Sequence, residues 1–214
     1  MRISSRSLLL VVAVAAVACA ATAPAPASAA TNPCRAESMR PGSTILAATK
    51  DAVVFRSRKY KTEAACTYRD KRITVIGGFA CCQLVRYALS GRYLAYAART
   101  DQADFEVDEM GVVDLRTGKR LRYKKQSAST TVDTNGYVES FFVTSRGTLV
   151  WSQTFFQNEA HTDENEAAIR TIAPGGETKD LDDSNTVDAT SLGVSSSGKR
   201  AYWVNGEAVK SAAL

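Results

Sequence analysis

Acidic side chains gathered in two short segments are the residues best suited to binding chemistry. Carboxylate and carbonyl oxygens are the ligands that calcium prefers, so a calcium-type cation could be held where the two segments converge. The alternative interpretation is that both segments are polar loops exposed to water. The two clusters consist of Asp101, Asp104, Glu106, Asp108 and Glu109, and of Glu159, His161, Asp163, Glu164 and Glu166.

A third acidic segment, residues 180–188, places oxygen-bearing side chains at alternate positions, like a degenerate calcium loop. It lacks the glycine at the sixth position and the glutamate at the twelfth position that such loops use. A solvated polar segment is therefore the favoured interpretation here.

Catalytic signatures are scarce in this chain. His161 is the only histidine, so a Ser–His or Cys–His nucleophilic mechanism would have to use it. The sequence contains no G-x-S-x-G, G-x-x-x-x-G-K-[ST], G-x-G-x-x-G or H-E-x-x-H motif. Carboxylates from separate loops could form a hydrolytic pair, but nothing in their spacing selects one. No cofactor other than calcium is indicated.

The first thirty residues predict a secretory signal peptide. Arg2 and Arg6 precede an apolar run from Leu8 to Ala18, and small residues then continue to Ala30. The apolar run is shorter than the roughly 20 residues that a membrane-spanning helix needs, so we expect a secreted, extracytoplasmic protein with no transmembrane segment in the mature chain. Lipidation at Cys19, in an imperfect lipobox, is the alternative to ordinary cleavage.

Four cysteines remain after this processing, and in an exported chain they predict disulfides. They are Cys34, Cys66, Cys81 and Cys82. A bond between the adjacent Cys81 and Cys82 would be far from ordinary disulfide geometry. We therefore expect Cys34 and Cys66 each to bond with one of the vicinal pair, in either of the two connectivities that remain.

The charge balance excludes nucleic acid as an expected partner. Without Arg2 and Arg6 the chain keeps 25 basic and 22 acidic residues, which is too slight an excess to indicate such binding. Basic residues do gather at 116–125 and 56–61. They protect strand edges or contact an anionic wall polymer outside the cell. An envelope protein is the other partner expected, and the oligomeric state is left open.

Short alternating segments separated by turn residues indicate strands throughout the chain past the signal peptide. A unit of tight turn and aromatic-tipped strand recurs, and Phe55, Tyr96, Trp151 and Trp203 occupy equivalent positions in its copies. Repeats of this size are typical of propeller blades. We expect the four aromatic side chains to fill one shared interior.

Each repeat also contains a second hairpin, clearest at residues 112–121. In that hairpin the Asp114 carboxylate can accept a hydrogen bond from a turn amide, and Gly118 can adopt the positive φ that the reversal needs. The sequence therefore predicts an all-β domain of four propeller-like, four-stranded antiparallel meanders at about 43–78, 83–125, 137–182 and 187 to the end. The last meander lacks its outer strand, which residues 31–43 or a second molecule could supply.

Residues 90–96 and 113–119 carry a family resemblance: Ser-Gly-Arg-Tyr-Leu-Ala-Tyr followed by Val-Asp-Leu-Arg-Thr-Gly-Lys. This pattern resembles the repeat of TolB-like, WD40-like β-propellers, and it is similar to secreted bacterial proteins of unassigned function that carry the repeat after a signal peptide. The resemblance covers most of residues 43–205 and implies binding more often than catalysis.

These observations predict a signal peptide at 1–30, an N-terminal segment at 31–42 and a single β-propeller-like domain at 43–214. The long loops, expected at 101–109, 127–136 and 157–166, should emerge on one face, opposite the tight turns, and provide the ligand-binding surface. The function expected is that of a non-catalytic exported binding or scaffold module. The alternatives are an extracytoplasmic hydrolase using loop carboxylates and a structural envelope protein.

Overall fold

A computed structural model describes residues 32–77, 82–102, 105–121, 131–133, 136–155 and 167–214. These residues belong to one compact unit, Thr31–Leu214. Among them, no helix has the length and apolar character needed to cross a lipid bilayer.

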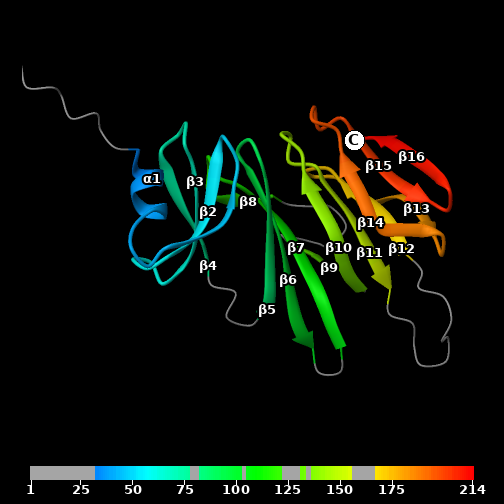
Figure 1. The fold of residues 1–214 in the computed structure, drawn as a ribbon, viewed down its shortest axis with the longest axis horizontal. Helices are drawn as coiled ribbons and strands as arrows, with labels where there is room; N and C mark the ends of the chain where they lie inside the picture. Colours follow the sequence, from blue (N-terminus) through cyan, green and yellow to red (C-terminus); the bar gives the residue numbers. More distant parts are fainter. Residues whose placement is uncertain (1–31, 78–81, 103–104, 122–130, 134–135, 156–166) are drawn as a thin grey trace, which may run out of the picture. The chain divides into compact units, whose positions relative to one another are not determined.

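Antiparallel sheets follow one another in sequence order (Figure 1), which confirms the predicted all-β, propeller-like fold. The first sheet contains β1 (Thr44–Ala48), β2 (Ala52–Ser57), β3 (Thr62–Thr67) and β4 (Arg72–Gly77). The second contains β5 (Cys82–Ser90), β6 (Tyr93–Gln102), β7 (Phe105–Asp114) and β8 (Lys119–Arg120), with β9 (Thr131–Asp133) also paired to β7.

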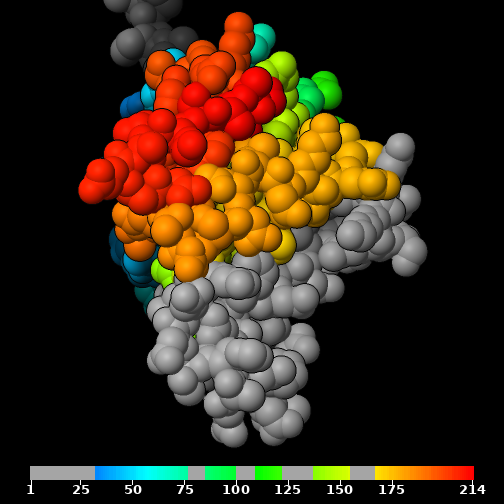
Figure 2. All heavy atoms as spheres, turned by 90° about the vertical axis from the view of Figure 1, so that its right-hand side faces the viewer, coloured from blue at the N-terminus to red at the C-terminus, as the bar shows by residue number. Residues whose placement is uncertain are grey.

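The third sheet contains β10 (Gly136–Val143), β11 (Leu149–Phe155), β12 (Ala167–Ile172) and β13 (Lys179–Ser184). The fourth contains β14 (Val187–Val194), β15 (Arg200–Asn205) and β16 (Ala208–Ala213). Its three strands agree with the missing outer strand predicted from the sequence. Figure 2 shows β16 and its neighbours at the surface, and Tyr202 and Val209 on these strands are 39% and 75% exposed.

The first strands of successive sheets lie next to one another, as in a propeller. β1 contacts β5, β5 contacts β10, and β10 contacts β14. A side chain strengthens one of these junctions, because Arg86 on β5 donates hydrogen bonds to the carbonyls of Val138 and Glu139 on β10. Each sheet therefore contacts the next one through its first strand.

The four equivalent aromatic side chains are buried, but they do not share one interior. Phe55, Tyr96, Trp151 and Trp203 are 0%, 0%, 1% and 4% exposed. Trp151 packs between the second and third sheets, Tyr96 between the first and second, and Trp203 between the third and fourth. Each ring thus fills a separate layer, because successive sheets pack face to face and leave no single central core.

The described part of the segment 31–43, residues 32–43, does not supply a strand to the fourth sheet. They contain a short helix, α1 (Pro33–Ser38), which packs on β2 and completes a cluster around Phe55. Asn32 begins the helix, since its side-chain oxygen accepts from the Cys34 amide at 3.0 Å and its Nδ2 donates to the Tyr68 carbonyl at 3.0 Å. The helix therefore covers the outer face of the first sheet.

The predicted disulfide pairing is wrong. Cys34 on α1 bonds to Cys66 on β3 across a Cα–Cα distance of 5.5 Å, and both residues are fully buried. Packing of the helix on the first sheet brings these two cysteines together, which spacing along the chain could not reveal. The bond leaves neither of them for the vicinal pair, of which Cys82 begins β5 and Cys81 lies outside the described residues.

Two of the predicted long loops contain strands. Residues 101–102 and 105–109 belong to β6 and β7, in which Asp101 pairs with Glu106 and Gln102 with Phe105. The segment 127–136 includes β9, which pairs with β7. Polar residues dominate both segments, and their composition concealed regular strand pairing. The third loop, 157–166, lies outside the described residues.

Candidate anion-binding pocket

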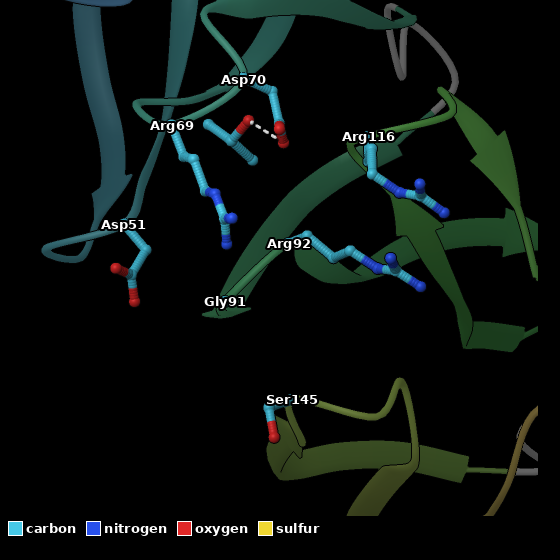
Figure 3. Close-up of a pocket in the computed structure, with 8 residues that line it drawn as sticks. Asp51, Arg69, Asp70, Gly91, Arg92, Arg116 and Ser145 are labelled. Carbon is cyan, nitrogen blue, oxygen red and sulfur yellow. Dashed lines mark hydrogen bonds between the residues drawn. The ribbon is translucent and has the colours of Figure 1, made fainter.

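A pocket of about 600 Å³ lies among the tight turns of the first three sheets, on the face opposite the one expected to bind ligand. Five turns contribute to it, one between each of the strand pairs β1–β2, β3–β4, β5–β6, β7–β8 and β10–β11. Three arginines and two aspartates dominate its lining (Figure 3). The side chains that matter are Asp51, Arg69, Asp70, Arg92, Arg116 and Ser145.

Arg92 is held by two neighbours. Its Nη2 donates to the Tyr93 hydroxyl at 2.7 Å, and its guanidinium lies 5.0 Å from the centre of that ring. Its Nε lies 3.5 Å from Oδ1 of Asp114. The hydrogen bond to Tyr93, together with the charge of Asp114, raises the pKa of Arg92 above its usual range. Arg92 therefore carries a fixed positive charge at this end of the pocket.

Asp114 also holds the turn that carries Arg116. Its Oδ1 accepts from the Arg116 amide at 2.9 Å, as the sequence predicted, and Gly118 takes a φ of +73° at the end of the turn. The carboxylate is buried, and it contacts the Arg92 side chain and the Arg116 backbone amide. Asp114 is accordingly a positioning residue for Arg92 and Arg116.

The first sheet anchors the same turn from the other side. Arg72 on β4 donates to the Arg116 carbonyl at 3.0 Å, and the Thr74 hydroxyl donates to the Leu115 carbonyl at 3.2 Å. These bonds link β4 to the β7–β8 turn. The walls of the pocket contributed by the first and second sheets are consequently connected by hydrogen bonds.

Arg69 and Asp70 occupy the β3–β4 turn. The Thr67 hydroxyl donates to Oδ2 of Asp70 at 2.9 Å, and the Lys71 amide donates to the Thr67 carbonyl at 3.0 Å, so the turn is well defined. Figure 3 shows the Arg69 side chain extending into the space between Asp51 and Arg92. The Asp70 carboxylate instead faces back toward its own turn.

The pocket is suited to holding an anion. Within the described residues, neither the Arg69 nor the Arg116 guanidinium has a hydrogen-bond or ion-pair partner, and both residues are exposed. A guanidinium offers a rigid fork of donors that matches carboxylate and phosphate oxygens. Arg69 and Arg116 each offer an available fork to an anionic group in this pocket, and Figure 3 shows Arg116 extending in the same direction as Arg92, away from Arg69.

The predicted acidic site is only partly described. Asp101, Glu106, Asp108 and Glu109 lie along β6 and β7, whereas Asp104 and the whole cluster at 159–166, including Glu159, His161, Asp163 and Glu166, lie outside the described residues. Convergence of the two clusters, and calcium binding by them, therefore stay predictions. No group of three or more His, Cys, Asp or Glu side chains is placed to hold a metal in the described part of the chain.

The carboxylates of residues 180–188 serve separate structural contacts. Asp180 pairs with Arg170 at 2.6 Å, and Oδ2 of Asp182 accepts from the Trp203 indole at 2.5 Å. Asp188 accepts from both the amide and the hydroxyl of Thr190, which lowers the pKa of Asp188. The segment is a strand, a turn and the start of a second strand, so these oxygens do not surround one point.

The turn-face pocket is the feature that sequence reasoning missed. The signal was present, since Arg69, Arg92 and Arg116 each follow or occupy a predicted tight turn. Attention to acidic long loops directed the prediction to the opposite face. What the sequence could not supply was the juxtaposition of turns from three different sheets.

Comparisons with known proteins identify no family. No protein-family profile matches the chain, and no curated protein sequence matches it significantly. Among solved structures, Kuenenia stuttgartiensis hydrazine synthase is similar over 75% of this chain, with 14% sequence identity and a TM-score of 0.40. The match spans 46% of that protein's chain. The class of the present protein, a propeller-like array of sheets with a basic turn-face pocket, rests on its own strand pairing and side-chain contacts.

Proposed function

We propose that this chain is an exported, non-catalytic binding module whose turn-face pocket holds an anionic group of an envelope ligand. The observation that carries the proposal is the grouping of Arg69, Arg92 and Arg116 around one cavity, two of them with available guanidiniums. An anionic wall polymer is the ligand class that this chemistry favours, because its repeated anionic groups match the exposed basic residues.

Export is supported by two independent features. Residues 1–30 have the order of charged, apolar and small residues typical of a signal peptide. The buried Cys34–Cys66 bond is typical of proteins that fold in an oxidising compartment. Both features agree with an extracytoplasmic module, and they are consistent with a partner in the cell envelope.

Binding is favoured over hydrolysis by the groups that the pocket presents. Guanidiniums stay protonated and cannot act as general bases. Of the two carboxylates that line the pocket, Asp70 is engaged by Thr67, which leaves Asp51 as the single candidate base. The pocket also distinguishes the proposal from a purely structural envelope protein, since the Arg69 and Arg116 guanidiniums have no partner among the described residues and so contribute little to packing of the sheets. The acidic segments near 101–109 and 159–166 are a second predicted ligand surface.

Calorimetric titration with inorganic phosphate and with a glycerol-phosphate polymer tests this proposal. Hydrogen bonds to charged groups contribute about 1.5–3 kcal/mol, so Arg69→Gln and Arg116→Gln should each weaken binding roughly tenfold or more. Arg58→Gln is the matched control for the phosphate titration, because Arg58 is exposed in the β2–β3 turn, outside the pocket. It should change the affinity less than about twofold, in line with a remote screened charge.

Two outcomes would overturn the proposal. One is the absence of binding to either probe by the folded protein at low salt. The other is an equal loss of affinity in the Arg58→Gln control and the pocket variants. That result would mean that the net charge of the protein, and not the pocket, attracts the anion. Circular dichroism and thermal unfolding of each variant establish that the fold is retained.

A further inference from the structure

A second, smaller cavity adjoins the arginine pocket. It measures about 190 Å³ and lies among the β5–β6, β10–β11 and β14–β15 turns. Ser145, on the β10–β11 turn, lines both cavities. The two spaces are therefore neighbours on the turn face, the arginine pocket toward the first sheet and the smaller one, called here the serine cavity, toward the fourth.

The lining of the serine cavity differs in chemistry from that of the arginine pocket. Among its described lining residues, none carries a charge. Leu89, Phe142, Val143 and Val194 provide apolar surface. Hydroxyl groups provide the polar part, from Ser90, Ser145, Ser195, Ser196 and Ser197.

One of these serines builds the cavity, while others are available to a ligand. Oγ of Ser195 accepts from the amides of Lys199 and Arg200 at 3.2 and 3.1 Å and bonds to the Ser197 hydroxyl at 3.2 Å, which fixes the β14–β15 turn. Within the described residues, the hydroxyls of Ser90, Ser145 and Ser196 have no hydrogen-bond partner. Each offers one donor and two acceptor positions.

An apolar surface rimmed by neutral hydroxyls matches the two kinds of surface that a sugar ring presents. The hydroxyl edge of a pyranose can exchange hydrogen bonds with serine, and its C–H face can pack on apolar side chains such as Phe142. Pockets commonly combine apolar lining with a few polar groups that fix orientation in this way. The absence of charge in the described lining favours an uncharged ring over a second anionic group.

We propose that the two cavities form one composite site for an acidic carbohydrate. The anionic substituent, a phosphate or a carboxylate, lies against Arg69 and Arg116, and an adjacent uncharged sugar ring lies in the serine cavity. Ser145 stands at the junction and contacts both parts. This inference rests on the proposed function, because the arginine pocket supplies the anchoring charge.

Titration with matched probes separates the two parts of the site. The probes are inorganic phosphate, maltose, maltose 1-phosphate and an aldobiouronic acid, in which one glucuronic acid is linked to one uncharged hexose. If the ring adds one or two hydrogen bonds at about 1 kcal/mol each, maltose 1-phosphate should bind roughly tenfold tighter than phosphate. A preference for the phosphosugar or for the uronic acid then identifies which anionic group the site accepts.

Ser196→Trp fills the serine cavity from an exposed position, and Ala208→Trp places the same side chain on exposed β16, outside both cavities. We expect Ser196→Trp to abolish the tenfold gain for acidic sugars while phosphate affinity is unchanged, and Ala208→Trp to alter neither. Ser196→Ala, which cannot obstruct folding, should reduce the gain severalfold by loss of one hydroxyl.

The results distinguish the two proposals. If phosphate binds through the arginines but acidic sugars bind no tighter, the composite site is refuted and the proposed anion-binding function stands. The same conclusion follows if Ser196→Trp leaves the sugar affinity intact. If neither phosphate nor acidic sugar binds, the proposed function fails, and the composite site fails with it.

Discussion

Removal of the Cys34–Cys66 bond should destabilise the whole unit. The bond spans 32 positions of the chain, and the loop-closure expression for that length gives about 3.7 kcal/mol at room temperature. Both residues are 0% exposed in the cluster beneath α1, so lost packing adds to this value. We therefore expect the Cys34→Ala/Cys66→Ala variant to lose about 4 kcal/mol, a large fraction of the usual stability of a domain.

Urea unfolding followed by circular dichroism measures this loss, because the slope of the transition also reports any change in cooperativity. The matched control is Cys81→Ala/Cys82→Ala, which should retain the Cys34–Cys66 cross-link in peptide maps made without reductant. Mapping that joins Cys34 or Cys66 to the vicinal pair would refute the pairing. If Cys34→Ala/Cys66→Ala lowers the free energy of unfolding by less than about 1 kcal/mol, the stabilising role assigned to the Cys34–Cys66 bond is refuted.

Three further perturbations test the packing, the pocket and the pH response. Trp151→Ala should lower the free energy of unfolding by about 3–5 kcal/mol, measured by thermal unfolding, because a buried ring is removed. Tyr202→Ala, at a 39% exposed position, should lower it much less. Equal losses in the two variants would contradict the layered core. Asp114→Asn should weaken phosphate binding severalfold while the circular dichroism spectrum stays unchanged, because it loosens both arginines that Asp114 contacts. An unchanged phosphate affinity would show that Asp114 does not position these arginines. The pKa of Asp188 is lowered by Thr190, so its stabilisation is present above the unfolded-state pKa and disappears as the pH falls through the lower folded-state value. Asp188→Asn should therefore flatten the acid side of the stability profile below about pH 4, and an NMR titration of Asp188 at or above the ordinary aspartate value would contradict this.

The strand order of the fold was predictable because its signals are local. A tight turn with glycine followed by an aromatic-tipped strand recurs along the chain, and antiparallel neighbours joined by short turns have few alternative pairings. Trp151 and Trp203 marked the second strands of their sheets for this reason. The division of the core into separate layers was not predictable in this way, because it depends on the packing of one sheet on the next.

The site depended on contacts that local patterns do not encode. Arg69 and Arg116 lie 47 positions apart in the sequence, and they line one cavity only because the first two sheets pack together and Arg72 bridges them at the turn. The prediction of the disulfide pairing failed for a related reason. A helix of six residues gives little periodicity to recognise, and its docking on the first sheet decides which cysteine Cys34 meets.

The position of α1 also bears on how the array of sheets ends. In each later sheet, the repeated aromatic side chain packs against the sheet before it, as Tyr96 does against the first sheet. Phe55 is the equivalent residue of the first sheet, and the surface it packs against is α1. The helix thus takes the place that a preceding sheet would occupy, which is the role of a terminal cap in repeat proteins. Closing the ring through this face would require the fourth sheet to displace α1, and the buried Cys34–Cys66 bond holds the helix there. The described sheets therefore form an open array with a covalently attached cap on the first sheet.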